Sequence, residues 1–263
     1  MINYLRKALR EVPFLRNRRF NFPSLRYVGN NLFDVAVTKK VKMFARNEDL
    51  KVIDEVFNQR RYATLFPFHK DSAVIVDIGA HCGSFSLFAA SGLGSSCKIY
   101  SFEPDAENFE FAKRNIERNS YANVFLECMG VGEKTEEREF FKAGSATAQH
   151  TTVTGAKTKD ANVQKVQVLS AADLLAKLNR TEIDFLKIDC EGAEYGFFYN
   201  ASPEILKQIT TISMEFHDLE SAEDTGLSLA KFFVAQGFSI VDIENEPTRH
   251  NRSFGRLLVT RQW

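Results

Sequence analysis

The sequence contains no apolar run near the roughly 18 residues that a membrane-spanning helix needs. Residues 1–26 also lack the apolar centre and the small-residue cleavage site of a signal peptide. No C-x-x-C pair and no spacing typical of a disulfide framework occurs among the four cysteines, which are Cys82, Cys97, Cys128 and Cys190. We therefore expect a cytoplasmic chain with reduced thiols, neither spanning a membrane nor exported.

An excess of either charge is missing as well, because 34 Lys and Arg balance 34 Asp and Glu. A neutral chain lacks the general attraction for nucleic acid that a basic chain has, so we expect no nucleic-acid partner. The basic residues are nevertheless concentrated at the start, where residues 1–26 hold seven of them and one acidic residue. We interpret residues 1–60 as a basic N-terminal helical extension and residues 61–263 as one domain.

A short amphipathic helix is predicted within this extension. Apolar residues recur at helical spacing from Ile2 to Val12, with basic residues among them, and Pro13 ends the pattern. Such a helix either packs on the domain or contacts an anionic surface. Residues 1–19 are therefore the candidate for peripheral membrane contact.

From Ala73 onward, apolar runs of strand length alternate with helical stretches. This alternation predicts an α/β fold, a Rossmann-like and mostly parallel sheet with helices on both faces. The expected strands are Val74–Ile78, Lys98–Phe102, Val124–Glu127, Ile183–Ile188 and Thr211–Phe216, and the expected helices are Ser84–Leu93, Asp105–Asn119, Ala171–Leu178, Pro203–Gln208 and Leu227–Gln236. The last two apolar runs, Gly237–Ile243 and Gly255–Thr260, have no helix-length segment between them and should form a C-terminal antiparallel β-hairpin.

A polar stretch rich in Thr, Ala and Gly interrupts this alternation between two further strand-like runs, Glu139–Phe141 and Val163–Val168. About 20 residues without regular structure are uncommon within a domain unless they are functional or disordered. Residues 143–162 are therefore a candidate lid, and a solvated loop is the alternative.

Two features at the ends of the first two expected strands indicate a ribose-containing cofactor. The first strand runs into Gly79-x-x-x-Gly83, where glycine lets the backbone approach a ligand and the free amides at a helix start suit a polar group. The second strand ends at Glu103, which is placed to accept hydrogen bonds from both hydroxyls of a ribose.

The same turn distinguishes between two cofactors. It reads Asp77-x-Gly-x-x-x-Gly rather than the G-x-G-x-x-G of dinucleotide-binding folds, and the chain closes with a β-hairpin. These details favour S-adenosylmethionine over a nicotinamide dinucleotide. Asp77 would then help to orient the ammonium end of the cofactor.

Four blocks carry a family resemblance: Val76-Asp-Ile-Gly-Ala-His-Cys-Gly83, Ser101-Phe-Glu-Pro104, Ile183-Asp-Phe-Leu-Lys-Ile-Asp-Cys-Glu-Gly-Ala-Glu194 and Met214-Glu-Phe-His217. With them the chain resembles the FkbM-type methyltransferases, within the class I S-adenosylmethionine-dependent fold. The resemblance runs from about Tyr62 to His217. It departs from the family pattern at His81, where Asn is usual, and at Asn200-Ala201, where Gly is frequent.

The resemblance implies the cofactor-binding residues of this chain. It places Gly79 and Gly83 under the methionine part of S-adenosylmethionine, Glu103 on the ribose and Met129 beside the adenine. A core methionine is the alternative for Met129. Asp77 and His81 complete the predicted cofactor site.

Charged residues crowd the end of the fourth strand, where Lys187, Asp189, Glu191 and Glu194 follow one another closely. Charged groups are rarely buried without a partner. This strand end therefore either opens into a polar cleft or forms a closed network in which Lys187 neutralises Asp189 or Glu194. Ligands of open α/β sheets bind outside the carboxyl ends of the strands, so these acids lie where a substrate would lie.

Glu215 and His217 lie two residues apart at the same end of the next strand, so their side chains share a face. Methyl transfer needs alignment of the acceptor and removal of its proton. Asp189, Glu215 and His217 are our catalytic candidates, and each remains open as the base. The pattern also resembles, loosely, the metal site of catechol-type O-methyltransferases, but the ligand order differs and the set suits Mg²⁺ or Mn²⁺ only moderately, so we predict no metal.

The resemblance and these residues together predict an S-adenosylmethionine-dependent O-methyltransferase. The acceptor it implies is a hydroxyl of a small molecule or a saccharide. Two other classes stay open, a nucleotide-dependent oxidoreductase and a non-catalytic domain that kept the fold.

Overall fold

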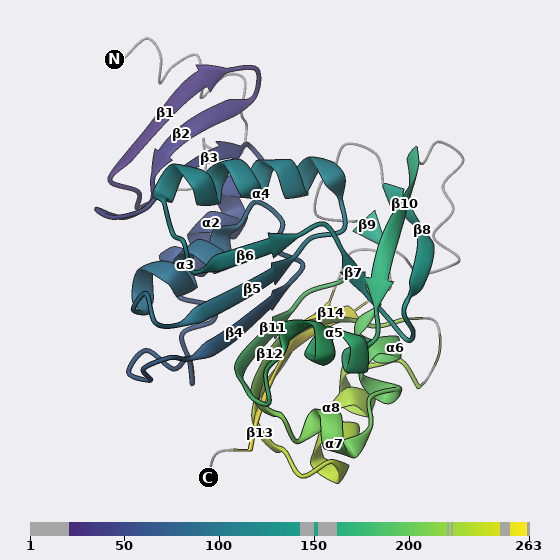
Figure 1. Cartoon of the computed structure of the whole chain (residues 1–263). Helices are drawn as coiled ribbons and strands as arrows, with labels where there is room; N and C mark the ends of the chain where they lie inside the picture. The colour runs from purple at the N-terminus through teal and green to yellow at the C-terminus, as the bar shows by residue number, and fades with distance from the viewer. Residues whose placement is uncertain are drawn as a thin grey trace.

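A computed structural model describes residues 21–142, 150–151, 162–219, 221, 223–247 and 253–261. Its centre is a seven-stranded sheet in the order β13-β14-β12-β11-β4-β5-β6 (Figure 1). These strands are β4 (Val74–Ile78), β5 (Lys98–Phe102), β6 (Val124–Glu127), β11 (Ile183–Ile188), β12 (Ile209–His217), β13 (Ser239–Pro247) and β14 (Ser253–Thr260). The first five are parallel, whereas β14 pairs antiparallel with both β12 and β13. The predicted mostly parallel sheet with a C-terminal antiparallel hairpin is confirmed.

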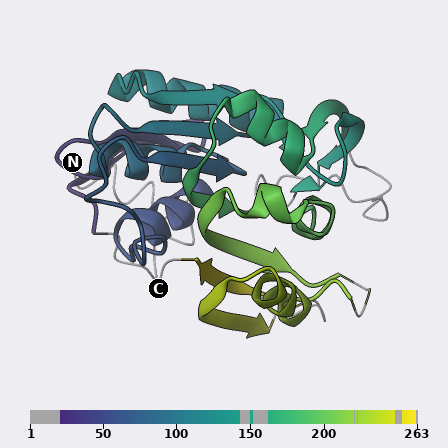
Figure 2. The same ribbon diagram turned by 60° about the horizontal axis from the view of Figure 1, so that its bottom comes forward.

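Helices cover both faces of this sheet (Figures 1 and 2). One face carries α2 (Asp49–Phe57), α3 (Ser84–Gly92) and α4 (Ala106–Asn119), and the other carries α5 (Ala171–Leu178), α6 (Glu194–Tyr199), α7 (Pro203–Leu206) and α8 (Gly226–Ala235). Each face of the sheet has its own hydrophobic core, and successive residues of β4 point into different ones. Ile75 packs with Phe85 near α3, while Val76 packs in the cluster that includes α5 and α8. A strand buried on both sides explains the continuous apolar runs of the sequence.

Capping residues explain which helices the sequence predicts well. Helices α4, α5, α7 and α8 each begin after a side chain that accepts a hydrogen bond from a backbone amide of the first turn, namely Asp105, Ser170, Ser202 and Thr225. Helix α6 was not predicted. It is six residues long and its N-cap residue, Ala193, makes no such bond, so the sequence carries no start signal.

Over the described residues 21–60, the N-terminal part differs from the helical extension predicted for residues 1–60. Residues 24–46 instead form an antiparallel sheet of β1 (Ser24–Gly29), β2 (Leu32–Ala36) and β3 (Lys42–Arg46). Two features account for the error. Burial alternates along β2 and β3, and the turn between β1 and β2 has Asn30 and Asn31 at φ +49° and +58°, as a two-residue hairpin requires.

This small sheet is fixed to helix α4 by two asparagines. The side chain of Asn115 bonds both backbone groups of Phe44, accepting at 2.8 Å and donating at 3.0 Å. One turn later, Asn119 does the same for Lys42, at 3.0 and 2.7 Å. The two amides thus pair the outer edge of β3 in place of another strand. The N-terminal sheet is therefore bonded to the domain that follows it.

A second, four-stranded sheet follows β6, in the order β7-β10-β8-β9. It consists of β7 (Gly130–Val131), β8 (Glu136–Lys142), β9 (His150–Thr151) and β10 (Asn162–Leu169). The two strand-like runs flanking the candidate lid are thereby confirmed as parts of β8 and β10. The candidate lid itself, residues 143–162, lies largely outside the described residues, as does the amphipathic helix at 2–12, so both stay predictions.

Across the part of the chain that the structure describes, no helix has the length and apolar character needed to cross a membrane.

Candidate active site

A pocket lies beyond the carboxyl ends of β4, β5 and β11, where an open α/β sheet binds its ligands. Its empty space measures about 900 Å³, part of it open to solvent. Of the predicted cofactor residues, Gly79, His81, Glu103 and Met129 line this pocket. Helix α2 adds Val52 and Val56 to the wall. The N-terminal part of the chain, which the sequence analysis set apart, therefore contributes to the pocket.

The glycine loop is held against the end of β11. Gly79 has φ +76°, and a Cβ atom placed there would lie 1.9 Å from the backbone oxygen of Asp189. Packing against the protein's own backbone thus already requires glycine at this position, independently of any ligand. Gly83, at φ +82°, precedes the first turn of α3. The loop is fixed on the strand that carries the acidic residues.

Glu103 is a buried carboxylate held by backbone amides. Its Oε2 accepts a hydrogen bond from the amide of His81 at 2.7 Å, and its Oε1 accepts one from the amide of Asp105 at 3.0 Å. The residue is 5% exposed and lines the pocket. Burial raises the pKa of Glu103 to about 7, although both amide hydrogen bonds lower it. Each oxygen keeps acceptor capacity for a ligand hydroxyl.

Asp77 lies behind the pocket rather than in its lining. It is fully buried, accepts a hydrogen bond from Ser86 Oγ at 2.6 Å, and its Oδ1 lies 3.2 Å from Lys187 Nζ. Lys187 also donates to the backbone oxygens of Ile78 and Gly79, at 3.0 and 2.6 Å. The ion-pair partner of Lys187 is therefore Asp77, and not Asp189 or Glu194 as in the closed network that the sequence left open. This buried pair fixes the glycine loop from below.

The three catalytic candidates converge. Each of Asp189, Glu215 and His217 offers one carboxylate oxygen or imidazole nitrogen, and these three atoms lie within 4.8 Å of one another. His217 Nε2 is 3.7 Å from Glu215 Oε1 and 3.5 Å from Glu191 Oε2. Asp189 and Glu191 line the pocket. We call the set of Asp189, Glu191, Glu194, Glu215 and His217 the acidic cluster.

His217 is the positive member of the acidic cluster. Glu194, fully buried, accepts a hydrogen bond from the His217 amide at 2.8 Å and lies 3.4 Å from its Nδ1. Burial alone would lower the pKa of His217, but the bond to Glu194 and the charges of Glu191, Glu194 and Asp189 raise it to about 10. The imidazole therefore carries its proton at neutral pH.

Two carboxyl groups of the acidic cluster also have raised pKa values, which for an acid favours the neutral form. Burial and neighbouring negative charges raise the pKa of Glu191 to about 8, although His217 lowers it. Burial and the charge of Asp189 raise the pKa of Glu215 to about 7, while Arg61 and His217 lower it. Because each pKa depends on the others, these groups titrate as a coupled set.

Arg61 is a residue that the sequence analysis missed. Its guanidinium donates to Glu215 Oε2 at 2.6 Å and to Glu55 Oε2 at 2.8 Å. Glu191 and Glu194 were noted only as neighbours of Asp189. The position of Glu194 shortly after β11 could have indicated that it belongs to the site. No local pattern connects Arg61 to Glu215, because the two residues are more than 150 positions apart.

Asp189, Glu215 and His217 have the donor types that can hold a divalent cation. In this structure, however, Arg61 binds Glu215 and the imidazole is protonated, so cations of the protein already neutralise the set. A second group of metal-ligand types is formed by Asp49, His81 and Cys82, but there the guanidinium of Arg46 binds both oxygens of Asp49. Neither group fits a metal without losing these ion pairs.

A comparison with family models matches residues 77–248 to the methyltransferase FkbM domain. Solved structures that align with the chain include an rRNA methylase from Streptococcus thermophilus, at 12% identity over 78% of this chain and 95% of that one, with a TM-score of 0.47. Magnesium protoporphyrin IX methyltransferase from Synechocystis PCC 6803 with bound SAM aligns at 14% identity over 99% and 96%, with a TM-score of 0.47. M. capricolum TrmK in complex with S-adenosyl-homocysteine aligns at 10% identity over 78% and 68%, also with a TM-score of 0.47. No curated protein sequence matches significantly.

Proposed function

The chain belongs to the FkbM methyltransferase family, and from this premise we propose that it moves a methyl group from S-adenosylmethionine to a hydroxyl of a small molecule or a saccharide. One observation carries the proposal. Asp189 and Glu191 of the acidic cluster line the same pocket as the amide-held Glu103, so a proton acceptor lies beside a ribose-type site.

The residues of the pocket fit S-adenosylmethionine. Glu103 offers one acceptor site on each oxygen to the two ribose hydroxyls, since the backbone amides of His81 and Asp105 use only one site each. Met129 borders the pocket on the same side and suits the adenine. Asp189 and Glu191 follow β11, two strands from β5 in the sheet, and the negative charge of Asp189 suits the cofactor's ammonium and sulfonium groups.

When bound, S-adenosylmethionine supplies an electrophilic methyl group on a positively charged sulfur. The protein's own task is to align the acceptor hydroxyl and to take its proton. Asp189 is the member of the predicted catalytic set that lines the pocket. We assign it the role of proton acceptor.

In this proposal His217 and Glu215 are not the base but set the charge around Asp189. A general base must be unprotonated before it acts, and the pKa of about 10 keeps His217 protonated near pH 7. The imidazolium instead sits among the carboxylates as a hydrogen-bond donor and counter-charge. Arg61 orients Glu215 by its bond of 2.6 Å.

The acidic side chains in the pocket lining limit which methyl acceptors suit the site. Asp189 presents a carboxylate to the pocket, Glu191 adds a carboxyl group that ionises at a pKa of about 8, and carboxylates repel phosphate groups. A neutral hydroxyl compound therefore suits the site better than a nucleic acid. An amine is the second candidate, because an acidic wall also attracts a cationic acceptor.

Titration calorimetry with S-adenosylmethionine and, separately, with NAD tests the cofactor. We expect saturable binding of S-adenosylmethionine and none of NAD, and the reverse result would make the chain an oxidoreductase-type domain. Extract metabolites incubated with the protein and S-adenosylmethionine labelled in its methyl carbon then test the transfer by mass spectrometry. Label on a product oxygen supports the proposal, label on nitrogen selects the amine, and binding without any labelled product contradicts catalysis.

A further inference from the structure

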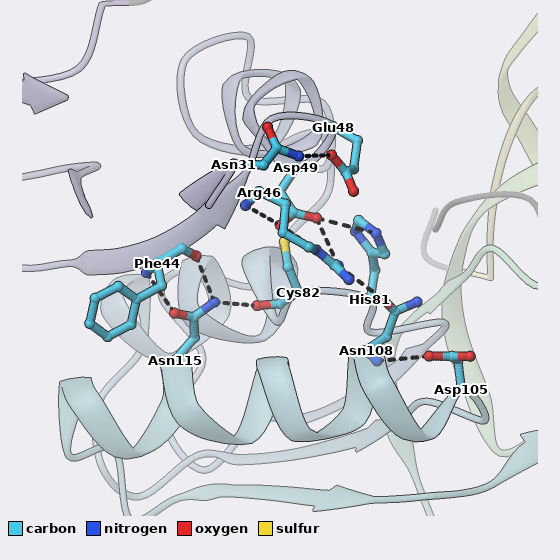
Figure 3. Close-up of polar contacts among 10 residues, drawn as sticks. All are labelled: Asn31, Phe44, Arg46, Glu48, Asp49, His81, Cys82, Asp105, Asn108 and Asn115. Carbon is cyan, nitrogen blue, oxygen red and sulfur yellow. Dashed lines mark hydrogen bonds and ion pairs between the residues drawn. The ribbon is translucent and has the colours of Figure 1, made fainter. Parts of the chain in front are cut away.

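The N-terminal sheet reaches the glycine loop through one buried carboxylate (Figure 3). Asp49, the first residue of α2, has no exposed surface. Its oxygens accept hydrogen bonds from the amide of Arg46 at 2.6 Å and from the guanidinium of Arg46 at 2.9 Å twice. This bidentate pair fixes the position of Asp49 relative to β3.

The same carboxylate contacts the glycine loop. Asp49 Oδ1 lies 3.4 Å from Nε2 of His81, a residue held in the left-handed region at φ +52°. The amide of His81 is one of the two that bind Glu103. Asp49 is thus connected, through one residue, to the carboxylate that we assign to the ribose.

The charge state of His81 suits this contact. Burial lowers the pKa of His81, although the charge of Asp49 raises it. The imidazole is therefore neutral near pH 7, and a neutral ring carries one N–H, which at Nε2 faces the Asp49 carboxylate 3.4 Å away. The contact fixes both the tautomer and the ring orientation of a residue whose backbone is in a sparsely populated conformation.

Two further hydrogen bonds connect helix α4 with the N-terminal part and with the loop. Arg46 donates to the side chain of Asn108 at 2.9 Å, in the first turn of α4. Asn115, which pairs with Phe44 of β3, also donates to the backbone oxygen of Cys82 at 2.9 Å. The N-terminal sheet, helix α4 and residues 79–83 therefore share one network (Figure 3).

We propose that Asp49 is a positioning residue for the cofactor: through His81 it holds the glycine loop and the amide bonded to Glu103 in the conformation that binds S-adenosylmethionine. The N-terminal sheet is then a working part of the cofactor site. His81, the position at which the chain departs from the family pattern, gains a physical role. This inference rests on the proposed function, because it assumes that S-adenosylmethionine binds at Glu103.

Asp34 provides a matched control. Like Asp49 it is an aspartate of the N-terminal part that accepts from arginines, here Arg26 at 2.8 Å and Arg118 of α4 at 2.7 Å. Both acids join this part of the chain to its surroundings through ion pairs, and the bonds described for Asp34 do not involve the glycine loop.

The experiment compares Asp49→Asn with Asp34→Asn by calorimetry with S-adenosylmethionine and by thermal melting. We expect Asp49→Asn to raise the Kd about tenfold, as for the loss of one hydrogen bond to a charged group, and Asp34→Asn to leave it unchanged. With an acceptor in hand, KM for S-adenosylmethionine should rise in Asp49→Asn while kcat stays near the wild-type value. Equal Kd values in the two variants, with a similar loss of melting temperature, would overturn the positioning role.

Asp49→Glu is a second variant for the case in which Asp49→Asn does not fold. It keeps the negative charge beside Arg46 but displaces the carboxylate from His81. We expect the same rise in Kd. In a His81→Ala background, adding Asp49→Asn should weaken binding no further, and additive effects would contradict the inference. A wild-type chain that does not bind S-adenosylmethionine would overturn the proposed function itself, whereas wild-type binding with unchanged Asp49 variants overturns only the positioning role.

Discussion

The site has two acidic regions, one at the ends of β4 and β5 and one at the ends of β11 and β12, and they are held in place by different interactions. At the ends of β4 and β5, a single carboxylate, Glu103, is held by two backbone amides. At the ends of β11 and β12, the acidic cluster is held mainly by other charged side chains, with Arg61 bonded to Glu215 and His217 placed among the glutamates. The first site depends on the path of the backbone, and the second depends on a balance of charges.

This difference determines how each site responds to change. An acid held by amides keeps its hydrogen bonds when a distant charge is removed. In the acidic cluster, each charge shifts the pKa of its neighbours, so one substitution alters the protonation of the rest. Mutations on the cofactor side should therefore have separable effects, and those in the cluster should be non-additive.

The largest expected effect is on the cluster side. Asp189→Asn should lower kcat at saturating S-adenosylmethionine by about 10²–10⁴, because it removes the proton acceptor, and should weaken cofactor binding by a smaller factor, because one negative charge near the cationic groups of the cofactor is lost. Asp184→Asn is the matched control, since Asp184 lies on the same strand at its opposite end, where it binds Lys70 and the amide of Val74. We expect this control to lower the melting temperature and to retain activity. Single-turnover rates measure both, and a near-normal rate in Asp189→Asn would remove Asp189 from catalysis.

A smaller effect is expected on the cofactor side. Glu103→Ala should weaken S-adenosylmethionine binding by about 2–4 kcal/mol, or about 30- to 1,000-fold in Kd, because two charge-assisted hydrogen bonds to the ribose are lost. Glu103→Gln should be milder. Calorimetry measures the loss, with Glu107→Ala, an exposed acid of the same region, as the control. Unchanged affinity in both Glu103 variants would show that the ribose lies elsewhere.

The sequence is a good guide to the central sheet for a physical reason. Strands β4, β5, β6 and β11 have the predicted bounds, because strands buried on both faces appear as uninterrupted apolar runs that end where the sheet meets the pocket. Glu103, Asp189, Glu215 and His217 were predicted on the same basis, since each lies just at or after such an end. Local pattern therefore places one or two side chains at each of these strand ends.

The sequence did not predict contacts between segments that lie far apart along the chain. Arg61 meets Glu215 only because the loop after α2 crosses the end of β12. The pairing of Lys187 with Asp77 follows from the register of β4 beside β11, which no single strand encodes. The N-terminal sheet was not predicted, although Asn30-Asn31 between two strand-length segments is a hairpin signal.

The central claim is that a carboxylate takes the acceptor's proton while His217 stays protonated, and the pH dependence of kcat at saturating S-adenosylmethionine tests it most directly. Wild type should gain rate as Glu215 and Glu191 ionise, with pKa values of about 7 and about 8, since their negative charge makes Asp189 a stronger proton acceptor. The rate should fall again as His217 loses its proton near its pKa of about 10.

His217→Gln makes the measurement decisive. Because the charge of His217 lowers the pKa of both glutamates, its removal should move the acid limb of the profile to higher pH. If the imidazole were the base, wild type would instead gain rate only as His217 loses its proton, near its pKa of about 10, and the substitution would abolish this limb. A displaced limb supports the account, and a vanished limb contradicts it.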